Sequence, residues 1–163
     1  MLRLWRLLSL LFTALALTMT SAHVLELPQK MQYDAEFYAA VNTSLYKYFA
    51  IIGGSYAIGA ILSLGILTLI LRNHRRSFRW TLAAFMFFVL WFVSWLAIVQ
   101  PVNNQIAQAL QSSADSVPAL YMTLRERWEY GHAIGFGLQL LGLMALIISV
   151  LKDTPDHVRS DYY

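Results

Sequence analysis

The sequence contains no cysteine and little charge. Without cysteine, the 163-residue chain has no disulfide bonds, no thiolate metal ligands and no cysteine nucleophile. Charged residues make up only 13% of the chain, hydrophobic residues make up 58%, and the mean hydropathy is +0.53. A soluble domain of this length needs a more polar surface, so we expect an integral membrane protein. Phosphate-binding loops, dinucleotide fingerprints and nucleophile triads are also missing from the sequence.

The apolar residues are grouped in segments long enough to cross a membrane, at roughly 20 residues per crossing. We predict spans at residues 4–27, 45–71, 80–100 and 127–151, with outer connections at 28–44 and 101–126. The predicted fold is therefore all-α, an integral membrane four-helix bundle in which residues 1–163 form a single transmembrane domain.

Basic residues gather in three segments that would share one side of the membrane. They are Arg3 with Arg6, the turn Arg72–Arg79, and the tail with Lys152 and Arg159. Cytoplasmic connections are enriched in lysine and arginine, so we expect both termini to be cytoplasmic. Topology then explains the net charge of +3, and nucleic acid is not an expected partner. We expect the bacterial inner membrane as the location, with lipids as neighbours.

Residues 1–22 also fit a cleaved signal peptide. Basic residues precede the apolar run, and Thr20-Ser21-Ala22 would serve as a cleavage site. Cleavage would expose His23 as an amino terminus, which can chelate copper through its amine and its ring. We favour an uncleaved span, because the run is long for a signal peptide and four spans enclose a polar site better than three.

Two mirrored pairs of ionisable residues lie near the ends of the first and fourth spans. His23 and Glu26 are spaced i, i+3, and Glu129 and His132 repeat that spacing in the opposite order. On antiparallel helices this inversion puts histidine beside histidine and glutamate beside glutamate. Imidazole and carboxylate together suit one transition metal ion (copper, zinc or iron) or buried acid–base chemistry. We predict a site of His23, Glu26, Glu129 and His132 near the outer membrane face.

The second and third spans carry no carboxylate at this depth, which disfavours a two-iron site. Asn103 would orient a ligand or a water molecule. Arg125 and Arg127 would either stabilise negative charge on a substrate or anchor the chain at lipid headgroups. The alternative is that the residues of the two pairs are ordinary polar residues at the membrane interface. Lys30, Arg125 and Arg127 would then be their hydrogen-bonding and ion-pair partners.

Small residues recur in the second and fourth spans. Gly131 and Gly135 form a G-x-x-x-G pattern, and Gly53 with Ala57 is a similar pair. Such patterns predict close contacts between helices. They also allow a non-enzymatic alternative, in which the face Gly53–Gly65 docks a membrane partner or a second copy of the chain.

Three segments carry a resemblance to a known family: AHVLELPQK at 22–30, QPVN at 100–103 and RERWEYGH at 125–132. Through these motifs and its order of spans, most of the chain resembles the anthrone oxygenase-like family of small bacterial and fungal membrane proteins. The resemblance implies a four-span bundle with polar residues on the first and fourth spans. Fungal members are associated with oxidation of anthrones to anthraquinones, whereas most bacterial members have no assigned reaction.

We therefore expect a membrane oxidoreductase or oxygenase-like protein that acts on a lipophilic aromatic substrate at the His/Glu site. Two alternatives stay open at this point. One is an accessory or assembly subunit without enzymatic activity, and the other is a protein that captures copper or zinc at its outer face.

Overall fold

The computed structural model describes residues 1–46 and 48–153, which are almost entirely helical. Arg159, expected in the basic tail, lies outside the described residues. The elements are α1 (Leu2–Lys30), α2 (Ala35–Ser44), α3 (Phe49–Ile70), α4 (Arg75–Ser112), the short 3₁₀ helix η1 (Ala114–Ser116) and α5 (Val117–Lys152). Within the described ranges no strand is formed. Helices α1, α3, α4 and the η1–α5 segment are each long and apolar enough to cross a membrane.

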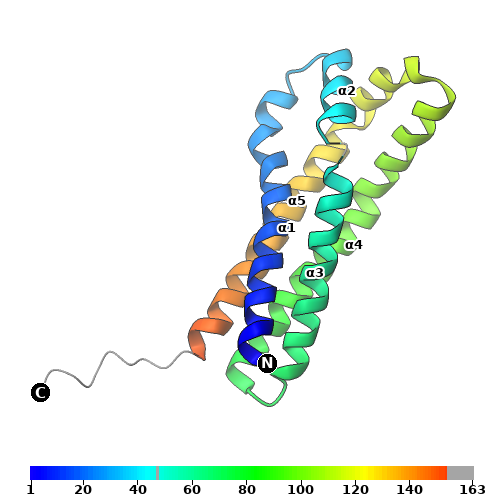
Figure 1. Ribbon diagram of the computed structural model, residues 1–163. Coiled ribbons are helices and arrows are strands. Elements are labelled where there is room, and N and C mark those ends of the chain that lie inside the picture. Colours follow the sequence, from blue (N-terminus) through cyan, green and yellow to red (C-terminus); the bar gives the residue numbers. More distant parts are fainter. Residues whose placement is uncertain (47, 154–163) are drawn as a thin grey trace, which may run out of the picture.

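The four long helices run alongside one another in one bundle, as Figure 1 shows. Helix α1 packs against α3 and α5, and α4 packs against α3 and α5. The beginning of α1, the α3–α4 turn and the end of α5 meet at one end of the bundle, which we call the basic end (Figure 1). Helix α2 packs on α5 at the opposite end, which we call the α2 end. The predicted all-α fold, with four helices long and apolar enough to cross a membrane, is confirmed. The cytoplasmic position of both termini stays a prediction.

The helices extend well beyond the apolar segments of the sequence. Helix α1 continues through Pro28 to Lys30, and α4 continues through Pro101 to Ser112. Much of the predicted outer connections 28–44 and 101–126 is therefore helical. Hydropathy indicates which part of a helix can lie in lipid. The backbone hydrogen bonds of a helix do not depend on apolar side chains, so a helix can continue past the apolar segment. Each proline removes one donor from its helix without ending it.

The outer surface of the bundle differs from that of a soluble protein. Large apolar side chains face outward, among them Leu7, Ile51 and Leu69 with 61%, 72% and 68% of their surface exposed. Small hydroxyl residues are buried between the helices instead. The hydroxyls of Thr81 on α4 and Ser149 on α5 are hydrogen-bonded at 2.7 Å. This pattern suits a bundle surrounded by lipid, where small and polar residues hold the helices together.

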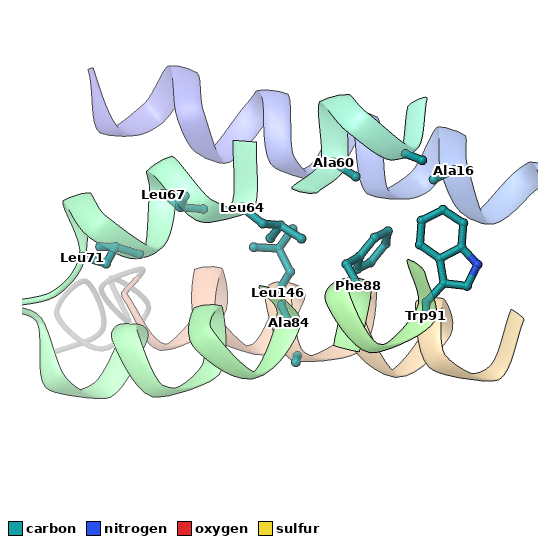
Figure 2. Packing of buried hydrophobic residues seen from close by; sticks show 11 residues of the cluster. Ala16, Ala60, Leu64, Leu67, Leu71, Ala84, Phe88, Trp91 and Leu146 are labelled. Carbon is teal, nitrogen blue, oxygen red and sulfur yellow. The ribbon is translucent and has the colours of Figure 1, made fainter. Parts of the chain in front are cut away.

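An apolar core fills the half of the bundle nearest the basic end. Figure 2 shows Leu64 of α3 and Leu146 of α5 meeting beside Ala84 of α4, with Phe88 and Trp91 next along α4. Leu64, Leu146, Ala84 and Phe88 have no exposed surface. This half of the bundle is therefore tightly closed.

Glycines allow α4 and α5 to approach each other closely. A Cβ atom added to Gly135 would lie 2.8 Å from the Trp91 ring, and one added to Gly142 would lie 2.7 Å from the Phe88 ring. The close helix contact predicted from the G-x-x-x-G pattern is thus present. In the Gly53–Gly65 segment, an added Cβ at Gly59 would lie 2.6 Å from Phe12 of α1. Part of the face proposed for partner docking is therefore used within the chain, and docking through it stays a prediction.

The glycine contacts can be tested with alanine. We expect Gly142→Ala to lower the free energy of unfolding by about 1–3 kcal/mol, because the fully buried Phe88 ring has nowhere to move. Gly137→Ala is the matched control on the same helix, since an added Cβ there meets nothing within 4 Å. The control should gain up to about 1 kcal/mol from helix propensity. Unfolding followed by circular dichroism in detergent measures both, and equal stability of the two variants would contradict the packing described.

Candidate functional site

The two predicted histidines lie side by side between α1 and α5. The ring centroids of His23 and His132 are 4.0 Å apart, and the rings are stacked with an angle of 26° between their planes. The Trp128 ring meets both, at 4.9 Å from His23 and 4.4 Å from His132. Tyr46, just after α2, lies 4.6 Å from His23. Two imidazoles are thus enclosed by aromatic rings from α5 and from the α2–α3 connection.

Glu129 is held by a lysine and a tyrosine. The Nζ atom of Lys30, the last residue of α1, lies 2.6 Å from Glu129 Oε1. The hydroxyl of Tyr38, on α2, donates a hydrogen bond of 2.8 Å to the same oxygen. Burial, together with the nearby Glu129 carboxylate, raises the pKa of Tyr38 above its ordinary value. The phenol therefore stays protonated and acts as a donor, and three helices converge on one carboxylate oxygen.

Aromatic rings surround the Lys30 ammonium. Its Nζ lies 4.6 Å from the centre of the Tyr46 ring and 4.7 Å from that of Trp128. It also donates a hydrogen bond of 3.4 Å to the Tyr46 hydroxyl. The faces of aromatic rings attract cations, so this surrounding stabilises a lysine side chain that is only 2% exposed.

The sequence prediction named Lys30 only in the alternative, as a partner of the acidic residues, and the Lys30–Glu129 ion pair agrees with that part of the alternative. The spacing of Lys30 gives a signal, because positions 23, 26 and 30 follow the i, i+3, i+7 pattern of one helix face. The predicted span ended at residue 27 because Pro28 follows. The helix continues past that proline, and the extra turn carries the ammonium group into the cluster.

Several buried polar atoms of the cluster have no hydrogen-bond partner among the described residues. They are His23 Nδ1, Glu26 Oε2, Asn42 Oδ1 and Glu129 Oε2. Three of the four are carboxylate or amide oxygens, which accept hydrogen bonds. Buried polar groups are nearly always paired, so four orphans near one place require an explanation. The three unpaired oxygens would accept a hydrogen bond from a hydroxyl group or would bind a cation.

A cavity of about 420 Å³ lies next to this cluster, between α1, α3, α4 and α5. Both histidines and Asn42 are part of its wall. Its aromatic lining, apart from the histidines, consists of Tyr46, Phe49, Trp91, Phe92, Trp95, Tyr121 and Trp128. Cavities of roughly 300–1,000 Å³ hold small organic molecules, and this one offers ring faces together with a few polar groups.

The other predicted site residues support the cluster or lie apart from it. Asn103 lines the cavity, and its Oδ1 accepts a 2.9 Å hydrogen bond from the Trp128 indole. Arg125 donates to the Tyr33 carbonyl at 3.0 Å, and its guanidinium lies 5.6 Å from the centre of the Tyr38 ring. Arg127 is exposed and donates to the backbone carbonyl of Ala97 at 3.1 Å. Neither arginine is part of the cavity wall, so their positions do not support a direct role at a substrate.

The described arrangement does not form a closed metal site. No three His, Cys, Asp or Glu side chains in the described ranges are grouped so that they could hold an ion. A metal must lie in the plane of each imidazole at about 2 Å from its nitrogen. Nearly parallel rings with centroids 4.0 Å apart do not direct two nitrogens at one such point. Lys30 also already supplies a positive charge to Glu129. Metal binding by His23, Glu26, Glu129 and His132 stays a prediction.

The contribution of the Lys30–Glu129 ion pair to stability can be tested by mutation. Lys30→Met should lower the free energy of unfolding by about 3–5 kcal/mol, because it leaves a buried carboxylate without its counter-charge. The double variant Lys30→Met/Glu129→Leu should recover most of that loss. Denaturation in detergent, compared across both single variants and the double variant, gives the coupling. Purely additive losses would show that the pair does not act as a unit.

Comparison with known protein families, with curated proteins and with solved structures finds no match for this chain.

Proposed function

We propose that the protein binds a hydroxylated, lipophilic aromatic compound in the cavity and promotes its oxidation. In this proposal His23 and His132 accept a proton from the compound. One observation carries it: an aromatic-walled cavity in the helical bundle adjoins a buried cluster that holds unpaired hydrogen-bond acceptors.

The cavity wall supports a flat aromatic ligand. Trp91, Trp95 and Trp128 come from two different helices and offer ring surfaces for stacking. The volume of about 420 Å³ suits a compound of a few fused rings. Because the outer surface of the bundle is apolar, a lipophilic compound dissolved in the bilayer would reach it more readily than a water-soluble one.

The unpaired acceptors support a ligand that carries hydroxyl groups. Asn42 Oδ1 is buried on the cavity wall without a partner, and His23 Nδ1 is likewise buried and unpaired. A phenolic hydroxyl would supply the missing donor. A buried polar atom left without a partner costs about 1–3 kcal/mol, so a hydroxylated compound is favoured over the plain hydrocarbon.

The chemistry proposed is proton transfer coupled to oxidation by dioxygen. A methylene group flanked by aromatic rings and activated by a carbonyl is acidic, and an imidazole can remove its proton. The electron-rich anion then reacts with dioxygen. Overall, a CH₂ group and one O₂ give a C=O group and one H₂O. Lys30, Glu129 and Tyr38 act as positioning residues, because they fix α1, α2 and α5 around the two rings.

Transition-metal binding at the same cluster is the second candidate. The observation that favours it is the unpaired His23 Nδ1 beside a second imidazole and the unpaired Asn42 Oδ1. These atoms are nitrogen and oxygen donors of the kind that copper, zinc and iron accept. A change in the orientation of one ring would be needed to bring both imidazoles to one ion.

Ligand binding can be tested by filling the cavity. Gly54 lines the cavity, and a Cβ atom added there meets nothing within 4 Å. We expect Gly54→Phe to weaken binding of dihydroxyanthrone by about tenfold or more, measured by tryptophan fluorescence quenching in lipid nanodiscs. Gly137→Phe is the control, because position 137 is equally free of neighbours and lies outside the cavity wall. Equal affinity in both variants would rule out this cavity as the binding site.

The histidines can be tested with glutamine, which keeps a polar side chain but cannot take up a proton. His23→Gln and His132→Gln should each slow the conversion of dihydroxyanthrone to dihydroxyanthraquinone by about 100-fold. Absorbance follows the quinone, and an oxygen electrode follows the consumption of O₂. His74→Gln is the matched control, since His74 is exposed in the α3–α4 turn at the basic end.

Elemental analysis of the same preparations separates the two candidates. About one equivalent of copper, zinc or iron in the parent protein, lost in both cluster variants but kept in His74→Gln, would favour the metal site. A rate that is unchanged in His23→Gln and His132→Gln would overturn the proton-transfer proposal.

A further inference from the structure

A second cavity lies at the basic end of the bundle, far along the helices from the histidines. Its volume is about 770 Å³, and it is formed where α4 begins and α5 ends. Its polar lining consists of Arg75, Arg76, Arg79 and Lys152. Its apolar lining consists of Trp80, Ala83 and Leu151.

The charges of this cavity are all of one sign. No carboxylate belongs to its lining in the described part of the chain. Asp153 follows Lys152 directly but is not part of the lining, and its carboxylate interacts with Arg6 and with Ser77 near the start of α4. Residues 75–79 also form the first turn of α4, whose unpaired backbone N–H groups add a partial positive charge. Four cationic side chains and a helix amino terminus therefore border the same cavity.

The apolar wall restricts the kind of anion. The Lys152 ammonium lies 5.4 Å from the centre of the Trp80 ring, so the charged and apolar parts of the lining are in contact. Leu151 is 65% exposed and continues this surface along α5. An inorganic anion would use only the charges. A phospholipid would use both parts, with its phosphate at the arginines and its acyl chain along Ala83 and Leu151.

The lining also distinguishes between classes of phospholipid. A zwitterionic headgroup brings an ammonium group that needs a carboxylate or a similar partner, and the described lining offers none. An anionic headgroup has no such requirement. The arginines stand at the start of one membrane-spanning helix and Lys152 at the end of another, which is the level expected for lipid headgroups.

We propose that this cavity is a binding site for an anionic glycerophospholipid. Arg75, Arg76 and Arg79 contact the phosphate group, and the Trp80–Lys152 contact closes one side of the site. This inference uses none of the residues assigned to the aromatic cavity, so it stands or falls independently of the proposed function.

The test is lipid retention by the full chain in a neutral detergent, measured by native mass spectrometry during titration with dioleoyl phosphatidylglycerol or dioleoyl phosphatidylcholine. We expect the anionic lipid to bind at least about tenfold more tightly than the zwitterionic one. Each basic residue near an anionic headgroup contributes a factor of about five, so Arg75→Gln/Arg79→Gln should weaken binding about 25-fold.

The matched control removes the same charge from the same end of the bundle. Arg3→Gln/Arg72→Gln changes two exposed arginines that are not part of the cavity lining, and it should leave binding unchanged within about twofold. Circular dichroism checks that both double variants are folded. If the control loses as much affinity as the cavity variant, the attraction belongs to the surface in general and the proposal fails.

Inorganic phosphate distinguishes a lipid site from a free-anion site. We expect phosphate at the concentration of the lipid to leave lipid binding unchanged. Displacement of the lipid by phosphate at equal concentration, or equal affinity for phosphatidylcholine, would overturn the assignment to an anionic phospholipid.

Discussion

The ion pair between Lys30 and Glu129 is the interaction on which the α2 end of the bundle depends. Removing two charges from water costs several kcal/mol for each ion, and only a close contact between them offsets that cost. The pair joins α1 to α5, and Tyr38 attaches α2 to the same carboxylate oxygen. His23 lies two turns from Lys30, and His132 lies one turn from Glu129. The stacking of the imidazoles therefore follows from where the ion pair forms.

The cavity exists because the two halves of the bundle are packed with different side chains. Toward the basic end, glycine at position 142 lets α4 and α5 approach, and leucines from α3 and α5 fill the remaining space. Toward the α2 end, the space between the helices is bordered by flat rings such as Trp95 and Tyr46. A second buried apolar cluster, which includes Tyr38, Val99 and Val102, packs at the α2 end beside this cavity.

Both candidate ligands are amphiphilic, and each of the two sites combines apolar and polar groups. The aromatic cavity combines ring faces with unpaired acceptors, which favours a ligand with hydroxyl donors. The cavity at the basic end combines an apolar wall with arginines, which favours an anionic headgroup. Helices α4 and α5 contribute to both. Most compounds dissolved in a bilayer are apolar, so apolar surface does little to discriminate between them. The polar groups therefore give each site its selectivity for a ligand.

The sequence by itself determined the class of the protein and the number of long helices, because apolar runs of this length have few other stable forms. The inverted spacing of His23–Glu26 and Glu129–His132 also indicated which two helices carry the ionisable cluster. Only the tertiary structure decided which groups pair within it. Glu129 Oε1 pairs with Lys30 and Tyr38, and Arg127 donates a hydrogen bond to a backbone carbonyl. The spacing of residues along a helix determines which face of the helix they share. The partner of a buried charge depends instead on where the neighbouring helices end and on which of their side chains lie at the same depth.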